Sequence, residues 1–218
     1  MSAIADSRQQ VLDRIRAATR NSTRGDEQPL AAVARDYIQK GKLTLRACHE
    51  RFIERLREYD ADVVECEPER IGGTIVAQLK ASGRRKFVVP DGLPAEWLVE
   101  GFDWKIDKGL SANEVEEVEG VVTACFCGVA ESGTIVLHHG STEGRRVISL
   151  LPDWHLCVVR ASQVVETLPE YFARCERTPE LVTWISGPSA TADIEMTRIK
   201  GVHGPRFLNV VLVKDARD

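Results

Sequence analysis

Short apolar runs alternate with helical segments through most of this chain, and this alternation constrains its fold more than any other feature. Strands that alternate with helices are typical of a mainly parallel central sheet with helices on both faces. The sequence therefore predicts an α/β fold. The clearest expected strands are residues 62–66, 86–89, 156–160 and 207–213.

The segments between these strands are predicted from helical spacing and turn residues. Thr44 is expected to cap a helix over 44–59, and Gly83 to end a helix over 69–82. Two apolar stretches close together around Glu131-Ser132-Gly133 predict a hairpin that interrupts the alternation. The remaining expectations are a strand at 104–106, a turn or short helix at 113–119, a strand (or a short helix and then a strand) at 121–129, a strand at 133–138, a helix at 162–174 and a buried strand at 181–186.

The N-terminal part differs from the rest in having little apolar surface. Residues 6–19 predict an amphipathic helix with Val11, Leu12 and Ile15 on its apolar side, and residues 21–29 form a polar linker. We therefore divide the chain into an N-terminal helix and linker over 1–34 and an α/β domain over 35–218.

Composition excludes several classes of function. The chain has 218 residues and a formal net charge of -4, with acidic and basic residues interspersed. A basic stripe with interleaved aromatic residues is absent, which argues against nucleic-acid binding. An apolar run of membrane-spanning length and the apolar core of a signal peptide are also absent. We expect a soluble cytoplasmic protein with no membrane span.

The cysteines and histidines are scattered. The six cysteines form no C-x-x-C motif, and the five histidines form no pair with zinc-ligand spacing. Cys125 and Cys127 alternate as in a strand, so both thiols are expected on the same side, either as a metal pair or as buried free thiols. We expect buried thiols, no metal and no iron–sulfur cluster on this chain.

The stretch over 187–195 is the strongest candidate for a ligand loop. A Gly/Pro/Ser/Thr turn between a strand and a short helical start would present free backbone N–H groups to an anion. The loop is expected at the carboxyl end of the parallel sheet, where open α/β sheets bind ligands. An ordinary capped turn is the alternative. The candidate ligand-binding residues here are Gly187, Ser189, Ala190, Thr191, Asp193, Lys200 and Arg206.

Three other clusters carry groups capable of chemistry. Glu131 places a carboxylate at the hairpin turn, either as a reactive group or as a turn residue. Arg145 and Arg146 lie on a glycine-flanked loop, either as ligand-binding guanidinium groups or as a solvated basic loop. His155 begins a strand, either as an acid–base group or as a hydrogen-bonded histidine. Glu131 and His203, which follows the ligand loop, are the candidate catalytic residues.

Three strings resemble one family. They are Gly128-Val129-Ala130-Glu131-Ser132-Gly133-Thr134, Gly144-Arg145-Arg146 followed by Ser149-Leu150-Leu151-Pro152-Asp153, and Ile185 to Glu195 continued by Lys200-Gly201-Val202-His203-Gly204-Pro205. Together they resemble the lactate-utilisation domain family, and within it the small lactate utilisation C group. The similarity extends from about residue 35 to residue 213.

The resemblance implies a fold like glucosamine-6-phosphate deaminase, ribose-5-phosphate isomerase and the CoA transferases. It also implies a bacterial role in oxidising L-lactate to pyruvate with iron–sulfur partner proteins. We expect a pocket that holds a small carboxylate or a phosphate-bearing cofactor between the 187–195 loop, Glu131 and the Arg145-Arg146 loop. Class I CoA transferases use a glutamate in a Glu-Asn-Gly turn, which Glu131-Ser132-Gly133 resembles. A non-catalytic assembly or regulatory subunit and a stand-alone CoA-transferase-like or sugar-phosphate enzyme are the alternatives.

Overall fold

The computed structural model describes residues 2–19, 36–177, 179–191, 199–200 and 204–214. It divides the chain into two units, Met1–Ile38 and Gln39–Asp218. The first unit contains the helix α1 (Ser2–Thr19), so the predicted N-terminal helix is confirmed and begins a turn earlier than expected. Val11 and Ile15 on its apolar side are both more than half exposed. Within the described residues, the helices are too short or too polar to cross a membrane.

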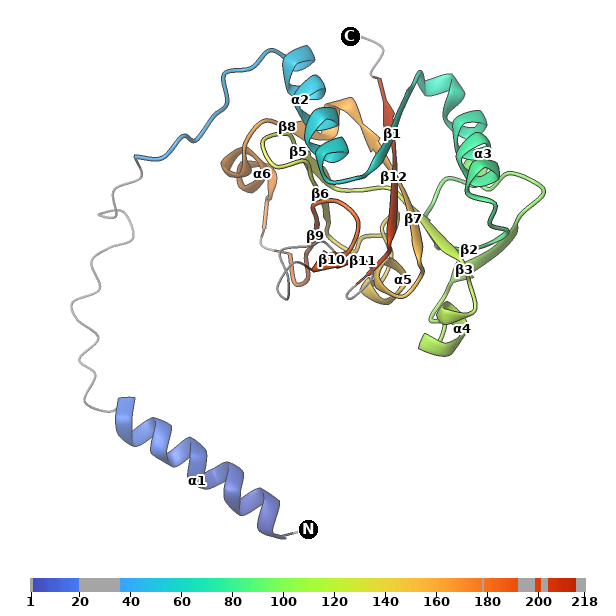
Figure 1. Ribbon diagram of the computed structural model, residues 1–218. Helices are drawn as coiled ribbons and strands as arrows, with labels where there is room; N and C mark the ends of the chain where they lie inside the picture. Colours follow the sequence, from blue (N-terminus) through green and yellow to red (C-terminus); the bar gives the residue numbers. More distant parts are fainter. Residues whose placement is uncertain (1, 20–35, 178, 192–198, 201–203, 215–218) are drawn as a thin grey trace. The chain divides into compact units, whose positions relative to one another are not determined.

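The second unit is built on a six-stranded sheet in which every pair of neighbours is parallel. This confirms the predicted α/β class with a parallel central sheet (Figure 1). In spatial order the strands are β1 (Asp62–Cys66), β12 (Phe207–Val213), β7 (Trp154–Arg160), β4 (Gly120–Thr123), β2 (Lys86–Pro90) and β3 (Asp103–Asp107).

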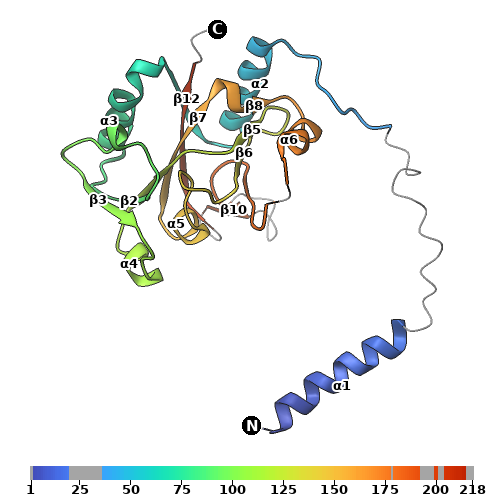
Figure 2. The same cartoon turned by 180° about the vertical axis from the view of Figure 1, so that it is seen from behind.

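Each face of this large sheet packs on a different layer. Alternate residues of a strand face opposite sides, so in β12 Val211 and Val213 join one core cluster while Val210 and Leu212 join another. The helix α3 (Ile71–Ser82) covers the first face, and α2 (Leu45–Glu58) lies against the second. Figures 1 and 2 show the two helices on opposite sides of β1 and β12.

The ends of these helices follow the predicted signals. The hydroxyl of Thr44 accepts a hydrogen bond from the backbone N–H of Ala47 at 3.2 Å, which begins α2. Gly83 ends α3 with φ of 70°, a left-handed conformation that glycine adopts readily.

A second, smaller sheet shares the α2 side of the large sheet. Its strands, in spatial order, are β8 (Val164–Val165), β5 (Cys127–Val129), β6 (Thr134–Leu137) and β9 (Thr183–Ile185). The pair β5–β6 is antiparallel, which confirms the predicted hairpin. Ile135 and Leu137 face the core that α2 covers, while Val136 faces Tyr171 on α6 (Leu168–Arg174).

Two sequence predictions were wrong because distant residues decide the local structure. The stretch 121–129 is two strands in different sheets, since Ala124 N–H bonds to Thr142 O and the chain leaves the large sheet there. Consequently Cys125 and Cys127 join different core clusters instead of facing one side. The stretch 162–174 is α-helical only from Leu168, because Val164–Val165 pair with β5.

Short elements complete the described structure. They are the α-helices α4 (Ala112–Glu116) and α5 (Arg146–Leu150), the 3-10 turns η2 (Pro68–Arg70), η3 (Ala95–Trp97) and η4 (Ala161–Gln163), and the strand pair β10 (Ala190–Thr191) and β11 (Ile199–Lys200).

Candidate functional site

The loop that the sequence singled out joins β9 to β10. Gly187 has φ of 84°, and a Cβ atom there would lie 2.5 Å from the Cβ of Tyr59, so the position requires glycine. The backbone N–H of Ser189 donates to Pro205 O at 2.8 Å. Ala190–Thr191 then pair with Ile199–Lys200 as antiparallel strands. Lys200 therefore lies in a strand and not in the helical segment that was expected to begin after the loop; Asp193 lies outside the described residues.

The loop lies at the amino edge of the large sheet, so the prediction that it lies at the carboxyl edge is wrong. Its neighbours show this, because Tyr59 precedes β1 and Pro205 precedes β12. The physical reason is the pairing of β9, which runs antiparallel to β6 in the small sheet and does not extend the parallel one.

A cavity of about 290 Å³ borders this loop, which we call the smaller cavity. Gly187, Pro188, Ser189 and Ala190 form one wall of it. A cleft is therefore present beside the loop, but the backbone N–H of Ser189, which was expected to be free for an anion, is bonded to Pro205 O. Outside the Gly187–Ala190 stretch, the polar residues that border it are Ser149, His155, Thr183 and Ser186.

His155 is a neutral group in this wall. Its side chain is 1% exposed, and its Nε2 lies 2.8 Å from the hydroxyl of Thr123. Burial lowers the pKa of His155 to about 4. Of the two roles left open by the sequence, the structure supports the hydrogen-bonded strand histidine, placed where it borders a cavity.

Arg145 is held in an ion pair. Its guanidinium forks onto Asp107, with Nε–Oδ2 at 2.8 Å and Nη2–Oδ1 at 2.5 Å. The hydrogen bonds from Arg145 hold the pKa of Asp107 below its usual range. Arg146 is the first residue of α5 and is exposed.

The loop that precedes Arg145 is fastened to the large sheet. Gly92 N–H donates to Ser141 O and Ala124 N–H donates to Thr142 O, both at 3.0 Å. Gly92 follows β2 and Ala124 follows β4, so the loop lies over the carboxyl ends of these two strands. That edge is where open α/β sheets usually bind ligands, and here chain segments occupy it.

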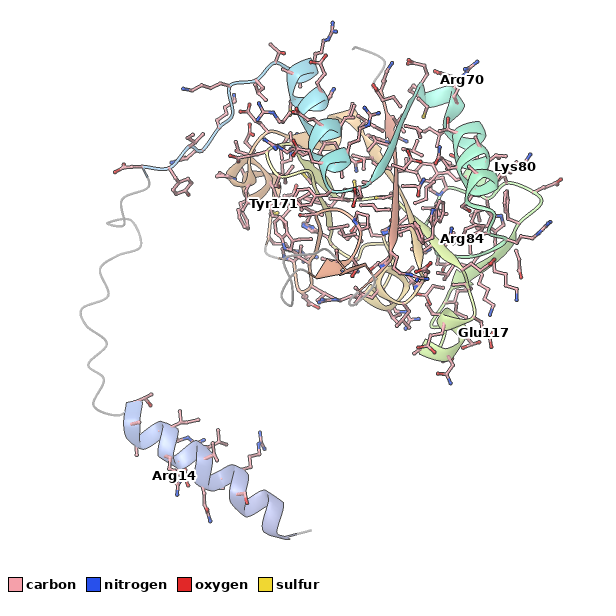
Figure 3. All side chains as sticks on the ribbon, in the orientation of Figure 1. Arg14, Arg70, Lys80, Arg84, Glu117 and Tyr171 are labelled. Atoms are coloured by element: carbon pink, nitrogen blue, oxygen red, sulfur yellow. The ribbon has the colours of Figure 1, made fainter. Side chains whose placement is uncertain are left out.

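Arg206 also pairs with an acidic residue. Its Nε lies 2.5 Å from Oδ1 of Asp153, whose Oδ2 lies 3.2 Å from Nη2 of Arg84. The three charges lie at the amino edge of the large sheet, where Figure 3 labels Arg84. Arg206 lies near the ligand loop in sequence, but it is not among the residues that border the smaller cavity.

Glu131 lies in the exposed turn between β5 and β6. Its backbone N–H donates to Glu166 O at 3.0 Å, and Glu131 does not border the smaller cavity. Gly133 in the same turn has φ of 61° and packs against Arg55, where a Cβ would meet side-chain and backbone atoms below 3.0 Å. His203 lies outside the described residues, as do the side chains of Thr191 and Lys200.

A second polar cluster was not predicted. His138 and His139 follow β6 and border a cavity of about 650 Å³, which we call the larger cavity. The His138 ring stacks on Phe126 with centroids 3.7 Å apart, and its Nε2 lies 2.8 Å from the hydroxyl of Tyr171, labelled in Figure 3. Burial lowers the pKa of His138. Two adjacent histidines between a strand and a glycine were the sequence signal.

Glu143 shapes the turn that carries these histidines. Its carboxylate is buried and accepts the backbone N–H of His138, and the backbone groups of His139 and Gly140 also face it. Burial raises the pKa of Glu143, and these backbone hydrogen bonds oppose that rise. The turn is therefore held from inside by one carboxylate.

The cysteines behave as small apolar side chains. All six are free and five are buried, as predicted. Burial raises the pKa of Cys48 and of Cys127 to about 11 in each case. Within the described residues, no three His, Cys, Asp or Glu side chains are grouped so that they could hold a metal ion.

Known proteins resemble this chain in both sequence and structure. A protein of Deinococcus radiodurans named lactate utilization protein C is 41% identical over 167 residues, which is 75% of this chain and 78% of that protein. A protein of the same name from an Exiguobacterium species is 31% identical over 211 residues, covering 88% and 91%. The crystal structure of a DUF162 family protein from Deinococcus radiodurans matches with a TM-score of 0.65 and 34% identity, covering 79% of this chain and 99% of that one. The LUD domain family model matches residues 27–213, and the chain belongs to the LUD domain family.

Proposed function

We propose that this chain is a component of a bacterial L-lactate utilisation system, which oxidises L-lactate to pyruvate together with iron–sulfur partner proteins. The names of its relatives support the role in lactate utilisation. We further propose that the chain binds a small carboxylate in the smaller cavity.

The observation that carries the ligand part is the cavity beside the Gly187–Ala190 loop. Its volume of about 290 Å³ lies near the lower end of ligand sites, roughly 300–1,000 Å³. A small hydroxy acid or keto acid fits this size better than a coenzyme does. Hydroxyl groups of Ser149, Thr183 and Ser186 give the wall the polar groups that orient a ligand.

The polar wall of the smaller cavity and the position of Glu131 argue against the two alternatives, a pure assembly subunit and a CoA-transferase-like enzyme. A pure assembly subunit would be expected to close such a cavity with apolar side chains, and the hydroxyl groups here favour a ligand. A CoA-transferase-like enzyme would need Glu131 in a cavity, and Glu131 is exposed on the hairpin turn. The resemblance to the CoA transferase fold remains a prediction.

Growth on L-lactate tests the role of the chain. Deleting its gene in the native bacterium should abolish growth on L-lactate and leave growth on pyruvate intact. A tagged chain purified without oxygen should bring iron and acid-labile sulfide with it. Normal growth of the deletion strain on L-lactate would refute the role.

Complementation tests the cavity. Ala190 borders the smaller cavity and is exposed, so the larger side chain of Ala190→Phe should obstruct the cavity without disturbing the packing of the core. Ala81→Phe, at an exposed position on α3, is the matched control. The first variant should fail to restore growth on L-lactate and the second should restore it, both with the melting temperature of the wild type. Full growth with a folded Ala190→Phe variant would exclude this cavity as the ligand site.

A further inference from the structure

One hydrogen-bonded pair joins a residue of the larger cavity to a residue of the smaller one. The ring of His139 borders the larger cavity, and Thr183 borders the smaller one. The Nε2 atom of His139 lies 2.8 Å from Oγ1 of Thr183, and its Nδ1 atom lies 2.8 Å from the carbonyl oxygen of Gly144. The pair ties the turn after β6 to β9, the edge strand of the small sheet.

The Gly144 carbonyl determines where the protons lie. A carbonyl oxygen only accepts hydrogen bonds, so Nδ1 of His139 must carry the proton. In the neutral imidazole Nε2 is then unprotonated and accepts the hydroxyl proton of Thr183. The oxygen of Thr183 therefore has its proton committed to His139, and it can offer only lone pairs to a ligand in the smaller cavity.

A neighbouring group has the same polarity. The hydroxyl of Ser149 donates to the carbonyl oxygen of Arg146 at 3.0 Å, so its oxygen also offers lone pairs. Thr183 is 9% exposed and Ser149 is 2% exposed, so both hydroxyl groups are buried and each has its proton engaged within the protein. This part of the cavity therefore favours a ligand group that donates a hydrogen bond.

The backbone at His139 is unusual in a way that matches this role. Its φ is 59°, and in the described part of the chain Asp60 is the only other non-glycine residue with positive φ. Such conformations persist where surrounding structure holds them, often at functional sites. Here the buried carboxylate of Glu143 holds the turn, and the conformation brings the ring to both Gly144 O and Thr183.

We propose that Thr183, oriented by His139, selects hydroxy acids over keto acids in the smaller cavity. The inference rests on the proposed ligand of that cavity and adds the residue that discriminates between substrate and product. The hydroxyl of L-lactate donates to Thr183 Oγ1. The keto oxygen of pyruvate has no proton to donate and faces a lone pair. Thr183 is thus a specificity-determining residue, and His139 is a positioning residue.

Calorimetric titration of the full chain with L-lactate and with pyruvate tests this. The wild type should bind L-lactate on the order of tenfold more tightly than pyruvate. This ratio is expected when L-lactate makes one hydrogen bond to Thr183 that pyruvate cannot make. Thr183→Val keeps the shape and loses the hydroxyl, so the preference should fall to within about twofold through weaker L-lactate binding. Thr183→Ser should keep the preference, and Thr74→Val on α3 should leave both affinities unchanged.

A second variant separates selection from a merely structural role. His139→Asn removes the acceptor of the Thr183 proton, and asparagine tolerates positive φ. The freed hydroxyl can then donate, so pyruvate should bind more tightly than it does to the wild type while L-lactate binds less tightly. A structural role would weaken both ligands together.

The outcomes distinguish this inference from the proposed function. If L-lactate and pyruvate both bind and Thr183→Val leaves their ratio unchanged, the inference is wrong and the ligand assignment stands. If neither acid binds the folded wild type, the ligand assignment fails and the inference fails with it. Parallel losses of both ligands in His139→Asn, in a folded variant, would also refute the inference.

Discussion

The large and the small sheet of this domain differ in what their side chains do. The large sheet has six parallel strands covered on both faces, and the side chains of β7 and β12 are mostly apolar and buried. The small sheet has strands of two to four residues, and its edge strand β9 carries the half-exposed Trp184 beside Thr183. The turns of the small sheet hold His138, His139 and Glu143. The large sheet is mainly a structural scaffold, although its His155 borders the smaller cavity, while Thr183, His138 and His139 lie in or beside the small sheet.

The two edges of the large sheet each carry an ion pair. Arg145 and Arg206 were both expected to bind a ligand, and each is paired with a carboxylate at an edge of the large sheet. Asp107 at the carboxyl edge is 2% exposed, while Asp153 at the amino edge is 33% exposed. The two pairs should therefore differ in their contribution to stability.

The largest expected effect contrasts two phenylalanines. Phe87 is fully buried in the large sheet and contacts the rings of Phe102, Trp104 and Trp154, whereas Phe172 on α6 beside the small sheet is 59% exposed. Phe87→Ala should lower the free energy of unfolding by about 3–5 kcal/mol, and Phe172→Ala by less than about 1 kcal/mol. Urea denaturation followed by circular dichroism measures both. Equal losses would contradict the division between scaffold and site.

The next effect is the pH dependence of stability, which His155 should dominate. Because burial lowers the pKa of His155 from 6.5 to about 4, the unfolded chain binds its proton first as the pH falls. The stability from the neutral ring is present above pH 6.5 and is lost between pH 6.5 and 4, by about 3 kcal/mol.

Denaturation at several pH values compares the wild type with His155→Gln. The variant has no ring to protonate and should lose less stability over this range. If both proteins show the same slope between pH 6.5 and 4, His155 is not the group responsible and its burial in the cavity wall is in doubt.

The smallest effect sharpens the contrast between the two ion pairs. Asp107→Asn leaves Arg145 with a weaker acceptor at a buried position and should cost about 1–3 kcal/mol of unfolding free energy. Asp153→Asn affects a more exposed pair and should cost less than about 1 kcal/mol. Raising the salt concentration should reduce the second loss more than the first. The reverse order would show that the amino edge depends more on its charges than the carboxyl edge does.

The success of the strand predictions has a physical cause. A parallel strand covered on both faces is a nearly continuous apolar run, so residues 86–89, 156–160 and 207–213 could be recognised without their neighbours. The failures over 121–129 and 162–174 share another cause. Val164–Val165 form a strand only because β5 lies beside them, and such pairing overrides local helical preference.

The candidate site was predicted only in part. The Gly187–Ala190 loop borders a cavity, as its turn residues indicated. Its position at the amino edge could not be predicted, because it depends on the antiparallel pairing of β9 with β6. The ion pairs of Arg145 and Arg206 could not be predicted either, because their partners Asp107 and Asp153 are distant from them in sequence.

The sequence alone therefore determined the α/β class, the family, the buried thiols and the loop that borders the smaller cavity. These depend on local spacing, on apolar periodicity and on turn residues that act over a few neighbours. Only the tertiary structure decided which edge of the sheet carries the loop, which cations are already paired and which strand the ring of His139 contacts. Each of these is set by a contact between residues far apart in the chain, such as His139 with Thr183, and local pattern contains no record of such contacts.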